Sequence, residues 1–171
     1  MIPVGGFMII FEYLNKRDFS VFAQRIFDIL ADNMTMIAPT GNSREEDFAL
    51  WSDSVSEGLK RSERQIILIK DNDNLIGYFQ YYTNADTFMM EEIQLKPKYQ
   101  GKGVFRSLYS FVIPRIRADI VFVEAFANIR NEKSIGILEH LGLSKIGMNK
   151  NGNSCYFRGS YSGLINWLNC Q

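Results

Sequence analysis

Hydrophobic and polar positions change their spacing several times along the chain, and each change marks the start of a new element. Alternating or continuous apolar positions indicate strands, whereas apolar positions three and four residues apart indicate amphipathic helices. This pattern predicts strands at residues 6–13, 65–70, 75–82, 87–95, 120–127, 143–147 and 155–161. It predicts helices at residues 18–31, 43–59, 103–118 and 131–141, and a short helical turn at the C-terminus.

Local signals sharpen several of these elements. Asp18 is expected to cap the first helix, and Ser43 with Glu46 three residues later forms a capping-box pattern at the second. Pro114 is expected to kink or end the helix 103–118, and Gly142 is expected to close the helix 131–141. The strand 120–127 is almost wholly apolar, so we expect it to be buried on both faces.

The order of elements is strand, two helices, three strands, helix, strand, helix and two strands. This order predicts a mixed α+β domain built around one sheet. A chain of 171 residues with 46% hydrophobic residues is long enough for a substantial core and fits one domain over residues 1–171.

Charge and rare residues exclude several functions. Lys+Arg and Asp+Glu both number 19, which argues against the basic excess of a nucleic-acid partner. The only histidine is His140, and Cys155 and Cys170 do not form a short-spaced pair, so we expect no metal site and a reducing, cytoplasmic setting. The apolar run at residues 7–11 is too short to span a bilayer, and we expect no membrane partner.

The segment after the strand 87–95 carries the clearest chemical signal. A proline, Pro97, is followed by Gly101, Lys102 and Gly103, and an amphipathic helix begins directly afterwards. Glycines let a backbone approach a phosphate closely, and the unpaired N–H groups of a helix start attract anions. The nucleotide-triphosphate and dinucleotide fingerprints are both absent, so a plain turn with a helix cap stays equally open on this motif alone.

A known family matches this segment. The sequence Pro97-Lys98-Tyr99-Gln100-Gly101-Lys102-Gly103-Val104 resembles the coenzyme A loop of the GNAT superfamily of N-acetyltransferases, whose pattern is Gln/Arg-x-x-Gly-x-Gly/Ala. Phe105 stands where the family has the last small residue. We expect this departure to shift the contact between helix and pyrophosphate without removing the loop.

A second segment resembles the same family. Residues 131–143 are similar to the family's Asn-x-x-Ala-x-x-Leu-Tyr-x-x-x-Gly-Phe, with Asn131 and Gly142 at the matching positions. The family often places a tyrosine at the position of Leu138 and uses it as the acid that protonates the leaving thiolate. Solvent-assisted departure of the thiolate is therefore the first expectation here, with Tyr109, Tyr156 or Tyr161 as alternatives.

The resemblance implies a fold, a cofactor and a site. The implied fold is the acyl-CoA N-acyltransferase fold, a mostly antiparallel sheet of about six to seven strands with splayed middle strands, flanked by helices. The implied co-substrate is acetyl-CoA, without a metal, and the acceptor is a small-molecule or protein amine; dimers are common in the family. The residues implied to hold coenzyme A are Leu95, Lys96, Pro97, Gln100, Gly101, Lys102, Gly103, Val104, Phe105, Asn131 and Ser134.

Two carboxylates on the strand before the loop are the candidates for catalysis. Relatives often take the base, or its water relay, from this strand, and here it carries Glu91 and Glu92. Strand alternation places Glu91 on the face of Leu95 and Glu92 on the other face, and we favour Glu91. At least one of the two is then a solvated surface group.

Two functions of different class remain on this basis. The first is an enzyme that acetylates an amine, with polyamines, aminoglycosides, amino-acid amines and ribosomal N-termini all open as acceptors. The second is a coenzyme A-binding sensor or assembly module with weak or no catalysis, which the loss of the tyrosine at Leu138 favours. Four aromatic residues are candidates for the acceptor pocket, although core packing is the commoner explanation for such residues: Phe48, Trp51, Tyr81 and Tyr82.

Overall fold

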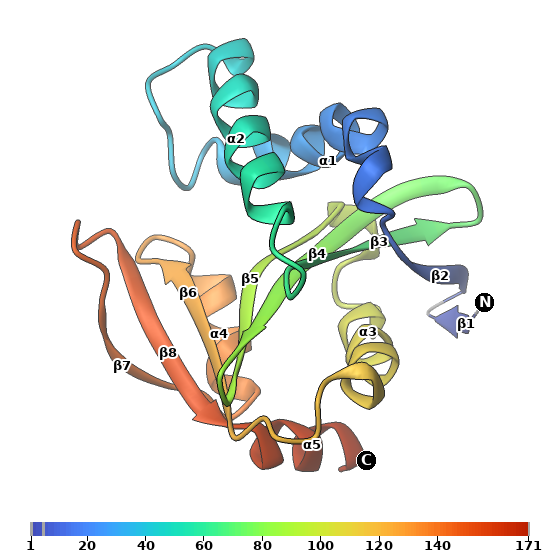
Figure 1. The fold of residues 1–171 in the computed structure, drawn as a ribbon, viewed down its shortest axis with the longest axis vertical. Helices are drawn as coiled ribbons and strands as arrows, with labels where there is room; N and C mark the ends of the chain where they lie inside the picture. The colour runs from blue at the N-terminus through green and yellow to red at the C-terminus, as the bar shows by residue number, and fades with distance from the viewer. Residues whose placement is uncertain (1, 5, 171) are drawn as a thin grey trace. The chain divides into compact units, whose positions relative to one another are not determined.

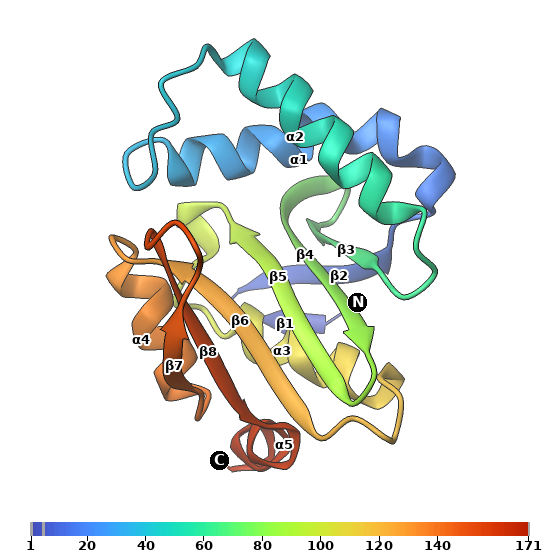
Figure 2. The same ribbon diagram turned by 60° about the vertical axis from the view of Figure 1, so that its left-hand side comes forward.

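The computed structural model describes residues 2–4 and 6–170. The strands are β1 (Ile2–Val4), β2 (Phe7–Tyr13), β3 (Gln65–Asp71), β4 (Asn74–Asn84), β5 (Thr87–Leu95), β6 (Phe122–Asn128), β7 (Ser144–Met148) and β8 (Ser154–Ser160). The α-helices are α1 (Phe19–Met34), α2 (Arg44–Leu59), α3 (Val104–Val112), α4 (Glu132–His140) and α5 (Tyr161–Asn169). Short 3₁₀ helices are η1 (Lys16–Asp18), η2 (Pro97–Tyr99) and η3 (Ile113–Arg115). The described strands follow the hydrogen-bonded order β1-β2-β3-β4-β5-β6-β8-β7 (Figures 1 and 2).

Two compact units make up the chain. The first comprises residues 1–80 and 92–107, and the second comprises residues 81–91 and 108–171. Strands β4 and β5 and helix α3 pass from one unit into the other, because their residue ranges cross these limits. Each unit is described in turn.

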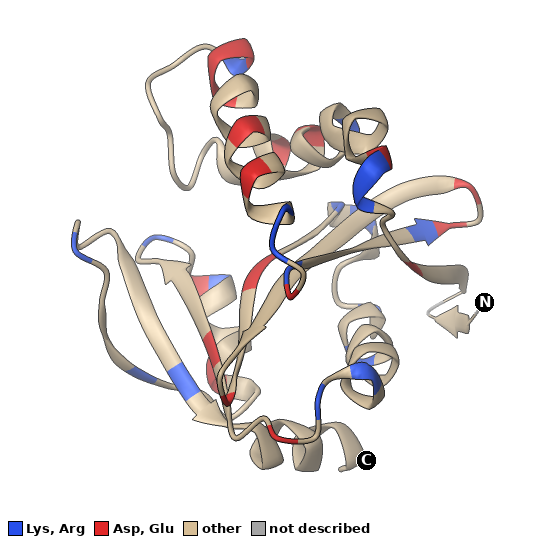
Figure 3. Cartoon of the chain, viewed as in Figure 1, with Lys and Arg blue, Asp and Glu red and all other residues tan. Residues whose placement is uncertain are grey.

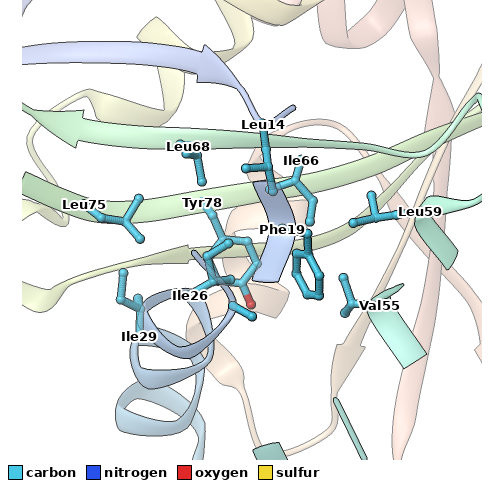
Figure 4. Packing of buried hydrophobic residues seen from close by; sticks show 11 residues of the cluster. Leu14, Phe19, Ile26, Ile29, Val55, Leu59, Ile66, Leu68, Leu75 and Tyr78 are labelled. Carbon is cyan, nitrogen blue, oxygen red and sulfur yellow. The ribbon is translucent and has the colours of Figure 1, made fainter. Parts of the chain in front are cut away.

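The first unit packs α1 and α2 against β3 and β4 (Figure 1). Side chains from both helices and both strands form its core, including Ile26 and Tyr78, which are fully buried (Figure 4). The antiparallel pairs β1–β2 and β2–β3 extend the sheet. The sequence pattern missed β1, which has three residues and contains Pro3, so the described sheet has eight strands where about six to seven were expected.

Helix boundaries test the local signals directly. The capping box at α2 is confirmed: the backbone N–H of Ser43 donates to Glu46 Oε2 at 2.8 Å, and the N–H of Glu46 donates to Ser43 Oγ at 3.2 Å. Asp18 is the N-cap residue of α1, as predicted, but its side chain makes no capping hydrogen bond, and the 3₁₀ turn η1 leads into the helix. The early end at Pro114 is confirmed, since α3 stops at Val112 and η3 follows.

The second unit contains a parallel pair within an otherwise antiparallel arrangement. Strand β5 pairs in parallel with β6 from Thr87↔Phe122 to Met90↔Ala125. Strands β6 and β8, and β7 and β8, pair antiparallel. Helices α4 and α5 pack against β6 and β8 (Figure 2). The predicted splaying of β5 from β6 concerns residues beyond this ladder and stays a prediction.

The expectation that β6 is buried on both faces is wrong. Val123, Ala125 and Ala127 are buried, whereas the alternate positions Phe122 and Glu124 are only partly buried and Phe126 is exposed. Buried and less buried positions alternate along β6, so only one face of the strand is covered and its apolar composition does not imply burial on both sides.

Candidate functional site

The loop between β5 and α3 has the backbone conformation that its glycines allow. Gly101 has a φ of 69° and Gly103 a φ of 81°, both in the left-handed region where an L side chain is strained. A Cβ atom added at Gly101 would meet nothing within 4 Å, so conformation, not space, requires glycine there. Gly103 accepts a hydrogen bond from the N–H of Ser107 at 3.2 Å, and α3 begins at the next residue, Val104.

This geometry can bind an anion. The first N–H groups of a helix have no intrahelical acceptor and lie at the positive end of the helix dipole. Gly101, Lys102 and Gly103 are exposed, so an anion can reach the backbone of the loop. Val104 is buried and Phe105 is half-buried, so these two side chains anchor the start of the helix.

Contacts within the first unit hold the loop in place. The hydroxyl of Tyr99 donates to Asp71 Oδ2 at 3.0 Å, and its ring packs on Phe7 with centroids 4.6 Å apart. Burial, followed by the hydrogen bond to Asp71, raises the pKa of the Tyr99 hydroxyl. The side-chain amide of Gln100 donates to the carbonyl oxygen of Leu95 at 2.7 Å and closes the loop on itself.

A chain of polar side chains links the end of β5 to α1. Asn33 on α1 donates to Gln94 Oε1 at 2.8 Å and to the carbonyl oxygen of Leu95 at 3.1 Å. Gln94 in turn donates to Glu92 Oε1 at 2.6 Å. These hydrogen bonds fix the side chain of Glu92 beside Gln94, which is itself bound by Asn33 of α1. The sequence pattern missed Asn33 and Gln94, and no local signal identifies them, because 61 residues separate the two.

Backbone groups at residues 95–97 already have partners. The carbonyl of Leu95 accepts from two side chains, Lys96 N–H donates to the carbonyl of Ile76 at 2.8 Å, and Lys96 C=O accepts from the N–H of Tyr99 at 3.0 Å. The carbonyl of Pro97 accepts from the N–H of Gln100 at 3.1 Å. A pantetheine arm that pairs with this segment would therefore have to share or displace one of these hydrogen bonds.

A hollow of about 670 Å³ opens beside this segment in the first unit. Its wall is formed by α1, the β3–β4 turn and residues 96–99. Two of its acidic groups, Asp28 and Asp32, are held by Arg44 at 2.8 and 3.0 Å. The ion pairs compensate these carboxylates, and the lysines at the mouth, Lys96 and Lys98, are exposed.

Residues predicted from the second motif have structural partners in the second unit. Asn131 is the N-cap of α4, and its side chain accepts from the backbone N–H of Ser134 at 3.0 Å. Leu138 is buried, with 8% of its surface exposed, so its side chain belongs to the core. Gly142 has a φ of 84° and follows the C-cap of α4, as predicted.

The three tyrosines proposed as acids differ in access. Tyr109 is fully buried and its hydroxyl contacts the sulfur of Met90 at 3.4 Å, while the hydroxyl of Tyr161 donates to the carbonyl of Ile113 at 3.3 Å. Tyr156 is only partly buried, and its hydroxyl hydrogen bonds to Glu124. Burial, and then this hydrogen bond, raises the pKa of Tyr156 to about 12.

Three of the aromatic residues proposed for the acceptor pocket lie in or against the protein core. Phe48 and Trp51 pack against the core of the first unit, with the ring of Phe27 5.4 and 5.5 Å away, and Tyr81 is buried.

Among residues 2–4 and 6–170 no group of three or more histidine, cysteine or acidic side chains is placed to hold a metal ion. No helix in the described part of the chain is long and apolar enough to cross a membrane.

The mixed sheet, the glycine loop after β5 and the helix that begins after the loop are the features expected of the acyl-CoA N-acyltransferase fold. The family model described as "Acetyltransferase (GNAT) family" matches residues 23–143, so the chain belongs to the GNAT acetyltransferase family. The predicted fold is thereby confirmed.

Solved structures support the same fold. An acetyltransferase from Thermus thermophilus superposes with a TM-score of 0.69 at 12% identity, over 90% of this chain and 97% of that one. The PaiA N-acetyltransferase from Thermoplasma acidophilum, in complex with coenzyme A, has a TM-score of 0.69 at 16% identity, over 90% and 99%. The spermidine N-acetyltransferase from Vibrio cholerae, in complex with CoA and spermine, has a TM-score of 0.59 at 18% identity, over 92% and 98%. No curated protein sequence matches the chain.

Proposed function

We propose that this protein transfers the acetyl group of acetyl-CoA to a primary amine. The observation that carries the proposal is the loop from Gln100 to Gly103, in which two glycines with positive φ lead directly into the N-terminus of α3. Backbone amides of this loop and of the first turn of α3 would hold the pyrophosphate. Structures similar in fold include one solved with coenzyme A and one solved with CoA and spermine, which supports the same co-substrate here.

The reaction would proceed by direct attack within a ternary complex. The neutral amine nitrogen forms a bond to the acetyl carbonyl carbon, and the bond from that carbon to sulfur breaks. Glu91 takes the proton released by the amine, directly or through a water, and the thiolate of coenzyme A receives a proton from solvent. Tyr156 is the alternative donor, because it is the one of the three proposed tyrosines whose side chain is only partly buried.

Glu91 is preferred to Glu92 as the base for a structural reason. The carboxylate of Glu92 accepts a hydrogen bond from Gln94, which is itself held by Asn33. A carboxylate that organises a buried polar chain is better suited to positioning the end of β5 than to exchanging protons with an acceptor.

A thermal-shift titration followed by a turnover assay tests the proposal. Acetyl-CoA should raise the melting temperature, because a ligand that binds only the native state stabilises it. Thiol release should then depend on an added amine. A thermal shift without thiol release for any amine would favour the second candidate, a coenzyme A-binding module without catalysis, which the burial of Leu138 at the usual tyrosine position supports. Absence of a shift at millimolar acetyl-CoA would refute both.

A further inference from the structure

One face of β6 and β8 in the second unit carries four side chains that are not buried. The cross-strand pairs Glu124↔Arg158 and Phe126↔Tyr156 place these four side chains on the same face of β6 and β8. None of the four is buried, whereas the opposite face carries the buried side chains of Val123, Ala125, Cys155 and Phe157.

Two aromatic rings on this face are already ordered. The rings of Phe126 and Tyr156 stack with centroids 4.8 Å apart and an interplanar angle of 15°. Phe126 nevertheless keeps 46% of its surface exposed. A flat apolar group that covers this ring removes apolar surface from water without the entropic cost of ordering the ring.

The charges of Glu124 and Arg158 on this face compensate each other. Arg158 Nε lies 3.1 Å from Glu124 Oε1, an ion-pair distance, although the N–H does not point closely enough at the oxygen to count as a hydrogen bond. The hydroxyl of Tyr156 also hydrogen bonds to Glu124, and only 12% of the Glu124 side chain is exposed. Figure 3 shows the two charges as neighbouring acidic and basic segments on β6 and β8. A ligand with several positive charges therefore finds no uncompensated carboxylate in this Glu124–Arg158 pair.

The proposed base belongs to the same face. Met89 pairs with Glu124 across the parallel ladder, so their side chains lie on one side of the sheet. Alternation along β5 then places Glu91 on that side, one residue beyond the last pair of the ladder, Met90↔Ala125. The intervening residue, Met90, faces the other side, where its sulfur contacts the Tyr109 hydroxyl at 3.4 Å.

We propose that the acceptor is a monoamine with an aromatic group a few bonds from its nitrogen, and that this group stacks on Phe126 while the amine reaches Glu91. Polyamines are then poor acceptors, because their additional charges would lose water while the carboxylate of Glu124 is already compensated by Arg158. This inference rests on the proposed acetyl transfer.

Initial rates of thiol release with three amines test the substrate class. We expect kcat/KM for 2-phenylethylamine to exceed that for n-propylamine and for spermidine by about tenfold or more, since burial of an aromatic ring is worth about one factor of ten or more. Equal rates for 2-phenylethylamine and n-propylamine, or a preference for spermidine, would overturn the inference.

A pair of variants locates the aromatic group. Phe126→Ala should raise KM for 2-phenylethylamine about three- to tenfold and leave kcat and the values for n-propylamine nearly unchanged. Ile129→Ala is the matched control, because Ile129 lies just beyond β6 and is 45% exposed. An equal effect of the two variants, or an equal effect of Phe126→Ala on both amines, would contradict the assignment.

A third variant tests the charge argument. Arg158→Gln removes the cation beside Glu124 and should raise kcat/KM for spermidine several-fold without a similar gain for 2-phenylethylamine. An unchanged value for spermidine, in a variant that remains folded by circular dichroism, would contradict the argument. Thiol release with several amines but without an aromatic preference would refute this inference alone, whereas no release with any amine would refute the proposed function itself.

Discussion

The side-chain amide of Gln100 donates a hydrogen bond to the carbonyl oxygen of Leu95 at 2.7 Å, and this contact ties the start of the glycine loop to the end of β5. The same carbonyl accepts from Asn33 at 3.1 Å, so the loop is joined through one backbone oxygen to helix α1. The backbone that is proposed to bind coenzyme A is therefore positioned by side chains distant in sequence.

Loss of this contact should weaken cofactor binding. Gln100→Met keeps the length of the side chain but removes the donor, so the loop loses one hydrogen bond worth about 1 kcal/mol, and Kd for acetyl-CoA should rise about fivefold. The matched control is Gln65→Met, because Gln65 Nε2 donates to the carbonyl of Ser62 at 2.9 Å, away from the loop. Isothermal titration checks both variants, and similar Kd values for the two would show that the Gln100 contact has no role in binding.

The glycines and the lysine of the loop should contribute unequally to acetyl-CoA binding. Gly101→Val strains a residue with a φ of 69° and should weaken acetyl-CoA binding strongly, while Lys102→Ala should weaken it mildly, because backbone amides are proposed to hold the pyrophosphate. Gly41→Val is the control for strain alone, since Gly41 has a φ of 85° and open space at its Cβ position. If a titration finds Lys102→Ala the most damaging variant, the amide cradle is wrong.

Replacing each of the two carboxylates of β5 should affect the pH dependence of the rate differently. Glu91→Gln should lower kcat about 10²-fold or more and remove the acid limb of the pH–rate profile, because a glutamine cannot accept the amine proton. Glu92→Gln keeps an oxygen that can accept the hydrogen bond from Gln94, so it should change kcat much less. The reverse result would assign the base to Glu92, and no effect of either would mean that the acceptor reacts as an already neutral amine.

A tyrosine restored at the position of Leu138 should harm the fold without helping the chemistry. The Leu138 side chain is buried, so the larger ring of Leu138→Tyr overfills the core and should lower the free energy of unfolding by about 1–3 kcal/mol. Glu139→Tyr, at an exposed position of the same helix, should change it by about 0.5 kcal/mol or less. Urea denaturation measures both, and turnover of Leu138→Tyr should not exceed that of the wild type. A clear gain in turnover would show that the side chain reaches the reacting thiol.

The last prediction concerns the buried hydroxyl of Tyr78. It lies among apolar side chains of α1 and α2 (Figure 4), and the described residues offer it no hydrogen-bond partner. Burial, and then the negative charge of Glu92, raises the pKa of this hydroxyl well above its usual value. Tyr78→Phe should therefore leave the free energy of unfolding unchanged or raise it by up to about 1 kcal/mol.

Tyr99→Phe is its control, because it removes a hydroxyl that donates to Asp71 at 3.0 Å and should lower the free energy of unfolding by about 1 kcal/mol. Chemical denaturation of the two variants measures both changes in the free energy of unfolding. A loss at Tyr78→Phe as large as that at Tyr99→Phe would show that bound water satisfies the Tyr78 hydroxyl.

Features set by neighbouring residues could be predicted from the sequence. The bounds of β5 are those expected, the capping box at Ser43 and Glu46 forms, and Pro114 ends α3, because each depends on backbone propensity or on hydrogen bonds within a few residues. The glycine loop belongs to the same group, since its conformation follows from Gly101 and Gly103 themselves.

Tertiary structure alone decided which side chains meet and which face of each strand is covered. Strand β1 exists because Ile2 pairs with Ile9 on β2, and Gln94 is ordered because Asn33 reaches it across 61 residues. The exposure of Phe126 could not be predicted from its apolar neighbours, although Glu124 within the same run was a sign of a partly solvated face. The burial of a side chain depends on where helices distant in sequence pack. The free energy of this packing comes from many residues that no local sequence pattern brings together.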